Sequence, residues 1–123
     1  MNEKQSQGLL NLTRVVLEQI FSEDAVSSTT NEDMEVFSSV VFHHLCSLFS
    51  GEHFDKPLIL IDRYGIATGK PKTLEAIANI YDTTTERIRQ VEQEALYQLK
   101  EAVLDDLLAI MYYYLEKEAA NTE

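Results

Sequence analysis

Three side chains between positions 86 and 90 carry the hydrogen-bonding groups that are needed to read the edges of nucleic-acid bases. Arg89 has a planar guanidinium that matches guanine, Gln90 has an amide that matches adenine, and Glu86 has a carboxylate that can accept from the cytosine amino group. At about 100° per residue, all three lie on one helical face, which also holds Thr85, Gln93 and Tyr97. The spacing indicates a helix that binds bases, although an ordinary helix with a solvated polar face has the same spacing.

The residues before this face predict a shorter helix that would position it. Thr73 is a natural N-cap, and apolar residues follow at helical spacing at Leu74, Ile77, Ala78 and Tyr81. This helix is expected to end at Asp82. The run from Thr83 to Glu86 then predicts a capping box, in which the Thr83 hydroxyl accepts from the Glu86 N–H and the Glu86 carboxylate accepts from the Thr83 N–H. The second helix would pack through Ile88, Val91, Ala95 and Leu99. The two helices and their short turn have the layout of a helix-turn-helix, in which the start of the second helix enters the major groove.

The segment GIATGKPKTLEAIANIYDTTTERIRQVEQEALYQL resembles the fourth domain (region four) of housekeeping bacterial RNA polymerase sigma factors. The last segment of that domain typically runs G-K-P-x-T-L-E-E-I-G and then V-T-R-E-R-I-R-Q-I-E-x-K-A-L-x-K-L. The resemblance covers residues 62–100, and the string E-R-I-R-Q followed by E and A-L is its specific part. It implies a stand-alone small protein, because 123 residues are too few for a complete sigma factor.

In that family the second helix reads the −35 promoter element, and the domain binds the flap of the polymerase β subunit. The resemblance therefore implies RNA polymerase core and promoter DNA as partners. The residues expected to bind DNA are Thr85, Glu86, Arg87, Arg89, Gln90, Lys70, Lys72 and Thr73. Arg87, Lys70, Lys72 and Thr73 would contact phosphates. The chain departs from the family where basic residues are usual, at Thr85, Glu94, Tyr97 and Gln98.

The formal charge of −11 is concentrated outside the resembling segment. Residues 1–51 hold 2 basic and 7 acidic side chains, residues 52–100 hold 7 and 8, and residues 101–123 hold 1 and 6. Such acidic flanks oppose DNA at long range and attract basic protein surfaces, unless they serve only solubility. Two hypotheses follow: a transcription module that binds polymerase and promoter DNA weakly, and an acidic protein-interaction module, or sigma decoy, that binds no DNA.

The rest of the chain also predicts helices, so the expected fold is all-α. A helical domain with the helix-turn-helix is expected over residues 31–100, with helices starting at Thr30 or Asn31 and at Asp55, the latter closed by Gly65. Residues 1–30 are expected to form an N-terminal arm, with seven loose residues, a helix over residues 8–21 and a polar linker. Residues 101–123 are expected to form a helical extension.

The apolar stripe of this extension is turned by about 120° from the stripe of the reading helix, at about 100° per residue. Either the helix bends near Glu101 or the extension meets another surface, which would be the N-terminal helix or a second chain in a homodimer. The residues expected at a partner interface are Val103, Leu104, Leu107, Leu108, Met111, Tyr114 and Leu115.

Several classes of function are disfavoured. Cys46 is the only cysteine, so no internal disulfide can form and a reducing cytoplasmic location is expected. No apolar run is long enough to cross a membrane. His43 and Cys46 lie one helical turn apart, but two ligands do not make a metal site. No catalytic constellation is visible, and GIATGK has the wrong spacing for a phosphate loop. We therefore expect no enzyme, no cofactor and no bound metal.

Overall fold

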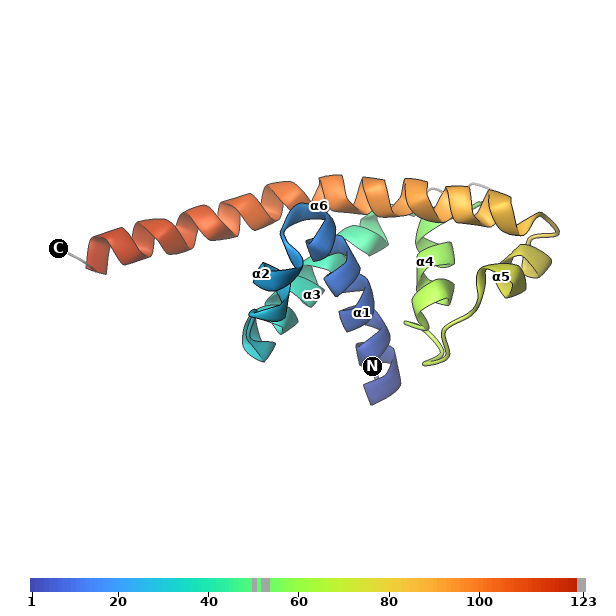
Figure 1. Ribbon diagram of the computed structural model, residues 1–123, viewed down its shortest axis with the longest axis horizontal. Coiled ribbons are helices and arrows are strands. Elements are labelled where there is room, and N and C mark those ends of the chain that lie inside the picture. The colour runs from blue at the N-terminus through green and yellow to red at the C-terminus, as the bar shows by residue number, and fades with distance from the viewer. Residues whose placement is uncertain (50, 52–53, 122–123) are drawn as a thin grey trace.

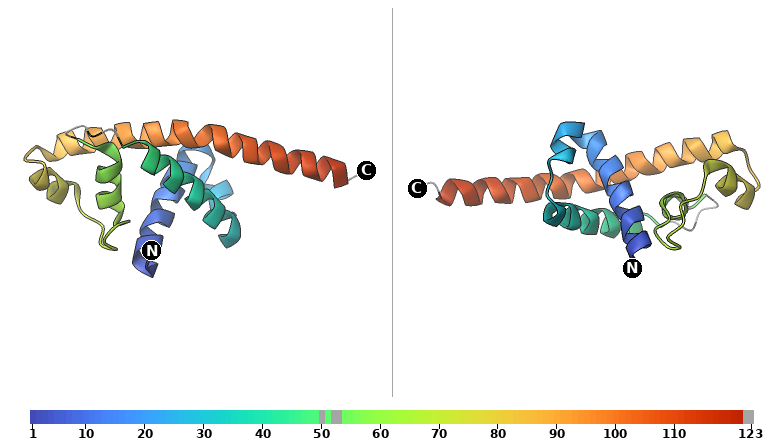
Figure 2. Two further views of the ribbon diagram at one scale, coloured as in Figure 1. Left: turned by 180° about the vertical axis from the view of Figure 1, so that it is seen from behind. Right: turned by 60° about the horizontal axis from the view of Figure 1, so that its bottom comes forward.

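The computed structural model describes residues 1–49, 51 and 54–121, with the side chains of the last helix described through residue 109. This part of the chain is built of helices without strands, as the sequence predicts: α1 Glu3–Ile20, α2 Glu23–Ser27, α3 Asn31–Ser47, α4 Lys56–Tyr64, α5 Leu74–Ile80 and α6 Thr85–Asn121. The longest helix, α6, runs the length of the molecule, and the other helices gather along its first part (Figures 1 and 2). None of the described helices is both long enough and apolar enough to span a membrane.

Helix α1 begins earlier than the sequence analysis predicts, and the expectation of seven loose residues is wrong. Asn2 and Gln5 form a capping box in which each side chain accepts from the backbone N–H of the other residue, at 2.9 and 2.8 Å. Gly8 then lets the helix approach the end of α4 closely, because a Cβ at this position would lie 2.2 Å from the Tyr64 carbonyl oxygen. The capping box and this close contact fix the first turns of α1.

The other helix boundaries follow local signals. The predicted linker contains the short helix α2, which Ser22 caps and whose Val26 is buried. Thr30 caps α3 by accepting from the Asp33 N–H at 3.2 Å, as expected. Helix α4 follows Asp55 and ends at Gly65, whose φ of 69° is a left-handed conformation that suits glycine.

Helix α6 continues without interruption through 37 residues and serves two apolar clusters in turn. Its first turns contribute Ile88 and Val91 to a small cluster with α4 and α5. Its middle turns contribute Ala95, Leu96, Leu99, Val103 and Leu107 to a larger cluster with residues of α1, α3 and α4. The apolar stripe therefore rotates along α6 because its first turns pack against α4 and α5, whereas its middle turns pack against α1, α3 and α4.

This packing corrects part of the expected partner interface. Val103 and Leu107 are buried inside the chain and are not available to a second chain. Leu104 is half-buried, whereas Leu108 is 54% exposed. Met111, Tyr114 and Leu115 lie outside the residues whose side chains are described. Among the expected interface residues whose side chains are described, Leu108 is thus the one that is mainly exposed.

Candidate nucleic-acid interface

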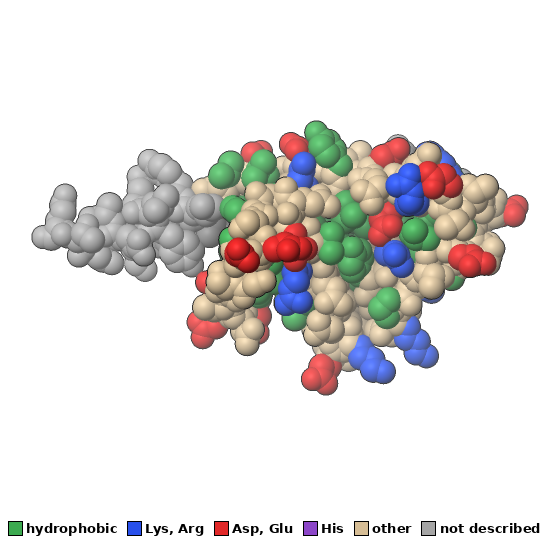
Figure 3. Space-filling view, in the orientation of Figure 1, with side chains coloured by type: hydrophobic (Ala, Val, Ile, Leu, Met, Phe, Trp, Pro, Cys, Tyr) green, Lys and Arg blue, Asp and Glu red, His purple; other side chains and the backbone are tan. Residues whose placement is uncertain are grey.

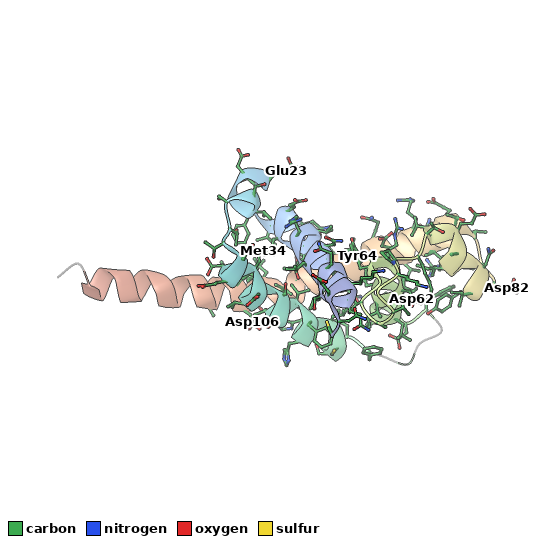
Figure 4. The ribbon with its side chains drawn as sticks, turned by 90° about the horizontal axis from the view of Figure 1, so that it is seen from below. Glu23, Met34, Asp62, Tyr64, Asp82 and Asp106 are labelled. Atoms are coloured by element: carbon green, nitrogen blue, oxygen red, sulfur yellow. The ribbon has the colours of Figure 1, made fainter. Side chains whose placement is uncertain are left out.

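The turn between α5 and α6 brings the predicted reading helix into position. Asp82 has a φ of 52°, a left-handed conformation that Asp tolerates better than most residues, and it lies at the tip of this turn (Figure 4). The Thr83 N–H donates to the Ala78 carbonyl at 3.0 Å, and the Thr84 hydroxyl accepts from the Arg87 N–H at 3.1 Å. Thr84 is therefore the N-cap of α6, and the predicted capping box between Thr83 and Glu86 is wrong by one residue.

The two helices of the helix-turn-helix are fixed to each other by the small apolar cluster. Thr73 caps α5 as predicted, because its hydroxyl accepts from the Ala76 N–H at 3.1 Å. The cluster consists of Ile59, Ile77, Ala78, Ile88 and Val91. Phe54 and Tyr81 pack at its edge with ring centroids 5.7 Å apart. The start of α6 is therefore held on a packed base.

The side chains at the start of α6 that we expect to contact DNA lie on the exposed side of this helix. Thr85, Glu86, Arg87, Arg89 and Gln90 are all exposed. The predicted inner face, made of Ile88, Val91, Ala95 and Leu99, is buried. The first two turns of α6 consequently present carboxylate, guanidinium and amide groups together at one end of the molecule.

Arg89 and Glu86 are paired with each other in this structure. Arg89 Nε lies 2.9 Å from Glu86 Oε2, and Arg89 Nη2 lies 2.6 Å from Glu86 Oε1. The hydrogen bonds from Arg89 lower the pKa of Glu86, and the same bonds raise the pKa of Arg89. The guanidinium fork that would meet guanine is thus occupied by a carboxylate, and a base must replace it.

Arg87 is held beside this pair by contacts of its own. Its guanidinium carbon lies 5.3 Å from the centroid of the Phe54 ring, within the range of a cation–π interaction. Its Nη1 lies 3.5 Å from Gln90 Oε1. These contacts direct Arg87 toward the segment before α4 and place the Gln90 amide next to a positive charge.

The loop before α5 carries the two lysines that were predicted to contact phosphates. Lys72 Nζ lies 3.3 Å from Asp62 Oδ1, so its charge is already paired. Lys70 is exposed, and its backbone N–H donates to the Thr68 hydroxyl at 3.1 Å. Of the two lysines in this loop, Lys72 is therefore paired with a carboxylate, whereas Lys70 is exposed.

An ion pair between half-buried Arg63 and buried Glu92, not foreseen from the sequence, supports this loop. Glu92 is only 7% exposed, and its carboxylate lies 3.2 Å from Arg63 Nε. Arg63 Nη1 also donates to the Lys72 carbonyl at 3.0 Å. Glu92 lies four residues after Ile88 and therefore on the apolar face of α6, where a carboxylate requires a cation. That register was the signal that could have revealed the pair.

Most cations around the helix-turn-helix are neutralised within the chain. Among the side chains described, ion pairs join Lys56 to Glu94, Arg63 to Glu92, Lys72 to Asp62, Arg89 to Glu86 and Lys100 to Glu101. Figure 3 shows acidic and basic side chains next to each other over the end of the molecule where α4, α5 and α6 meet. The face is therefore polar and mixed in sign rather than basic.

The described residues also offer no cluster of three or more His, Cys, Asp or Glu side chains that could hold a metal ion.

The fold and this face define a class of protein, namely an all-α helix-turn-helix module whose second helix begins with an exposed polar face. Residues 57–101 match the family model for sigma-70, region 4. Residues 57–101 of the chain are therefore similar to sigma-70, region 4, in agreement with the resemblance noted from the sequence.

Known sigma factors share this segment with the chain. The RNA polymerase sigma factor SigA of Nostoc sp. is 53% identical over 38 residues, which make up 31% of this chain and 10% of that protein. SigA of Synechocystis sp. has the same identity over the same length and is covered to 9%. The chloroplastic RNA polymerase sigma factor sigF of Arabidopsis thaliana is 35% identical over 68 residues, 55% of this chain and 12% of that protein. The chain spans about a tenth of the length of these curated relatives. No solved structure matches it significantly.

Proposed function

We propose that this chain is a transcription module that binds RNA polymerase core and reads −35-like promoter DNA with the start of α6. The observation that supports this most strongly is the exposure of Glu86, Arg89 and Gln90 on a helix that Ile88 and Val91 hold against α5. The similar proteins are named RNA polymerase sigma factors, which supports polymerase as the partner. The β flap is the part of polymerase that we propose as the tether.

Each exposed group has a proposed role on the DNA. Arg89 would bind guanine through two parallel hydrogen bonds, Gln90 would bind adenine, and Glu86, once released from Arg89, would accept from cytosine. Thr85, Arg87, Lys70, Lys72 and Thr73 would contact the backbone and set the register. When Arg89 binds guanine, the base would replace the Glu86 carboxylate as its hydrogen-bond partner.

Affinity for DNA without polymerase should be low. Phosphate neutralisation dominates nucleic-acid affinity, whereas this chain has a formal charge of −11 and pairs most cations near its reading helix internally. Attachment to polymerase would raise the effective concentration of promoter DNA at α6 without any new contact. Binding to polymerase would therefore increase the observed affinity of the chain for promoter DNA.

The same observations favour a second candidate, an acidic protein-interaction module or sigma decoy that binds no DNA. In that case Arg89 would stay paired with Glu86 and would never contact a base. The acidic excess in residues 1–51 and 101–123 would then attract a basic partner surface.

Variants of Arg89 separate the two candidates. We expect Arg89→Ala to weaken binding to a −35-like duplex about 5- to 150-fold, as for a lost bidentate base contact of about 1–3 kcal/mol. Arg89→Lys should keep the charge and the salt dependence but lose the preference for guanine. Fluorescence anisotropy at low salt, with and without core polymerase, measures both effects.

Arg14→Ala is the matched control, because Arg14 is an exposed arginine on α1, outside the helix-turn-helix. It should leave the base preference unchanged. If core polymerase retains wild type and Arg89→Ala equally, and promoter DNA is bound by neither in any condition, the interaction-module candidate is the correct one.

A further inference from the structure

We infer that the start of α1 and the α4–α5 loop form a single phosphate-binding corner, in which Lys4 extends the backbone contact of Lys70. We call these two lysines the Lys4–Lys70 corner. The inference deepens the proposed DNA binding and rests on it. Neither the family match, at residues 57–101, nor the expected DNA contacts include any residue of α1.

Close packing joins the first turns of α1 to the loop. Gly8 approaches the Tyr64 carbonyl, and the Gln5 side-chain amide donates to the Ala67 carbonyl. A Cβ on Gly69 would lie 2.9 Å from the Cβ of Lys4, so the Lys4 side chain starts beside the residue that precedes Lys70. Figure 4 shows Tyr64 next to α1 in the view from below. Lys4 and Lys70 are therefore neighbours in space although 66 positions separate them.

Both lysines of the corner are exposed, and neither has a carboxylate partner among the described residues. Lys56, Lys72 and Lys100, in contrast, are each paired within the chain. In Figure 3, basic side chains and an acidic one stand at the lower edge, where Figure 1 places the start of α1 and the α4–α5 loop. Uncompensated positive charge on a strongly acidic protein fits an anionic partner.

The backbone beneath the corner is fixed, so little order has to be gained on binding. The Gly69 N–H donates to the Gly65 carbonyl at 2.8 Å, and the Thr68 hydroxyl bridges the N–H and the carbonyl of Lys70 at 3.1 and 3.2 Å. Gly65 and Gly69 take positive φ angles of 69° and 77°, which only glycine adopts readily. The main remaining cost is the ordering of two lysine side chains.

The position of the corner points to the DNA backbone rather than to another anion. Lys70 precedes the N-cap of α5 by three residues, which span at most about 10 Å. This corresponds to about three base-pair steps of 3.4 Å each. A phosphate strand that passes the start of α5 would therefore reach the corner in the duplex that flanks the bases read by α6.

The salt dependence of DNA binding tests the corner. The free protein is titrated with a −35-like duplex over a range of salt concentrations, as wild type, Lys4→Gln, Lys70→Gln and Arg14→Gln. Each substitution removes one positive charge at an exposed position, and Gln has nearly the helix propensity of Lys or Arg. We expect the slope of log affinity against log salt to become shallower by about 0.9 for Lys4→Gln and Lys70→Gln and to stay unchanged for Arg14→Gln. Base preference should be unchanged in all three variants.

A second arm uses duplexes shortened from either end. Removal of the flank that the corner contacts should make the wild-type slope shallower by about 1.8, because both lysine contacts are lost, and wild type, Lys4→Gln and Lys70→Gln should then have the same slope. Equal slopes for wild type, Lys4→Gln and Arg14→Gln on the long duplex would overturn the corner but not the reading of DNA by α6. No DNA binding by wild type in any condition would overturn both. A loss of polymerase binding by Lys4→Gln without DNA would assign the corner to an acidic protein surface instead and overturn the inference.

Discussion

The exposed pair between Glu86 and Arg89 decides which groups are free at the proposed reading surface. The residues are three positions apart on α6, a spacing at which opposite charges meet on a helix surface. Exposed pairs of this kind contribute little to stability because water and salt screen them. We therefore expect the pair to hold the Arg89 guanidinium beside Glu86 and still to exchange readily for the edge of a guanine base.

Titration of Glu86 checks this pairing. Hydrogen bonds from Arg89 depress the pKa of Glu86 in the folded protein, so the pairing is complete above the ordinary carboxyl pKa and is lost as pH falls through the depressed value. Carboxyl-carbon NMR should give Glu86 a pKa below its usual range, and Arg89→Gln should return it toward that range. An ordinary pKa for Glu86 in wild type would show that the pair is not formed in solution.

At the scale of the element, the cap of α6 sets where the exposed face begins. Four consecutive positions, Thr83, Thr84, Thr85 and Glu86, allow more than one capping register. The structure selects Thr84, because the Thr83 N–H is already used by the Ala78 carbonyl at the end of α5. The local sequence pattern could not identify Thr84 as the N-cap, because the position of the cap depends on how α5 ends.

Alanine substitution at the two threonines distinguishes the registers. Thr84→Ala should lower the free energy of unfolding by about 1 kcal/mol, within the 0.5–2 kcal/mol typical of a lost N-cap. Thr83→Ala, the matched control, should change it by less than about 0.5 kcal/mol. Urea unfolding followed by helical circular dichroism measures both values. A larger effect at Thr83 would restore the capping box that the sequence suggested.

At the scale of the whole molecule, α6 couples the helix-turn-helix to helices that lie outside the family match. Leu12 of α1 and Leu107 of α6 belong to the same buried cluster, and α3 packs against both helices. His44 of α3 also lies 2.6 Å from Asp106 of α6. The α1 helix is thus part of the core against which α6 packs.

Core substitutions test this coupling. Leu12→Ala and Leu107→Ala should each cost about 2–5 kcal/mol, as fully buried leucines do, whereas Leu108→Ala, at a position 54% exposed, should cost less than about 0.5 kcal/mol. Amide hydrogen exchange at Val91 should speed up in the first two variants, because α6 is continuous through both clusters. Unchanged protection at Val91 in Leu12→Ala would mean that α1 is an independent arm.

Much of the fold could be predicted because its signals are local. The caps at Thr73 and Thr30, the start of α4 after Asp55 and the left-handed end at Gly65 each depend on a few adjacent residues. The start of α1 was missed although Asn2 and Gln5 form a local capping box, because the contacts of this turn with the rest of the chain, Gln5 to Ala67 and Gly8 to Tyr64, join segments that are distant in the sequence. The Arg63–Glu92 pair was missed for the same reason: its partners come from different helices.

The amino-acid sequence by itself determined that the chain is helical, that a segment of it resembles sigma-70 region 4, and that Glu86, Arg89 and Gln90 share one face, because helical periodicity and motif spacing are properties of neighbouring residues. Only the tertiary structure decided that Arg89 is engaged with Glu86, that Val103 and Leu107 are buried against the chain's own helices, and that Lys4 lies beside Lys70. These outcomes depend on side-chain geometry and on packing between distant segments, which no local pattern specifies.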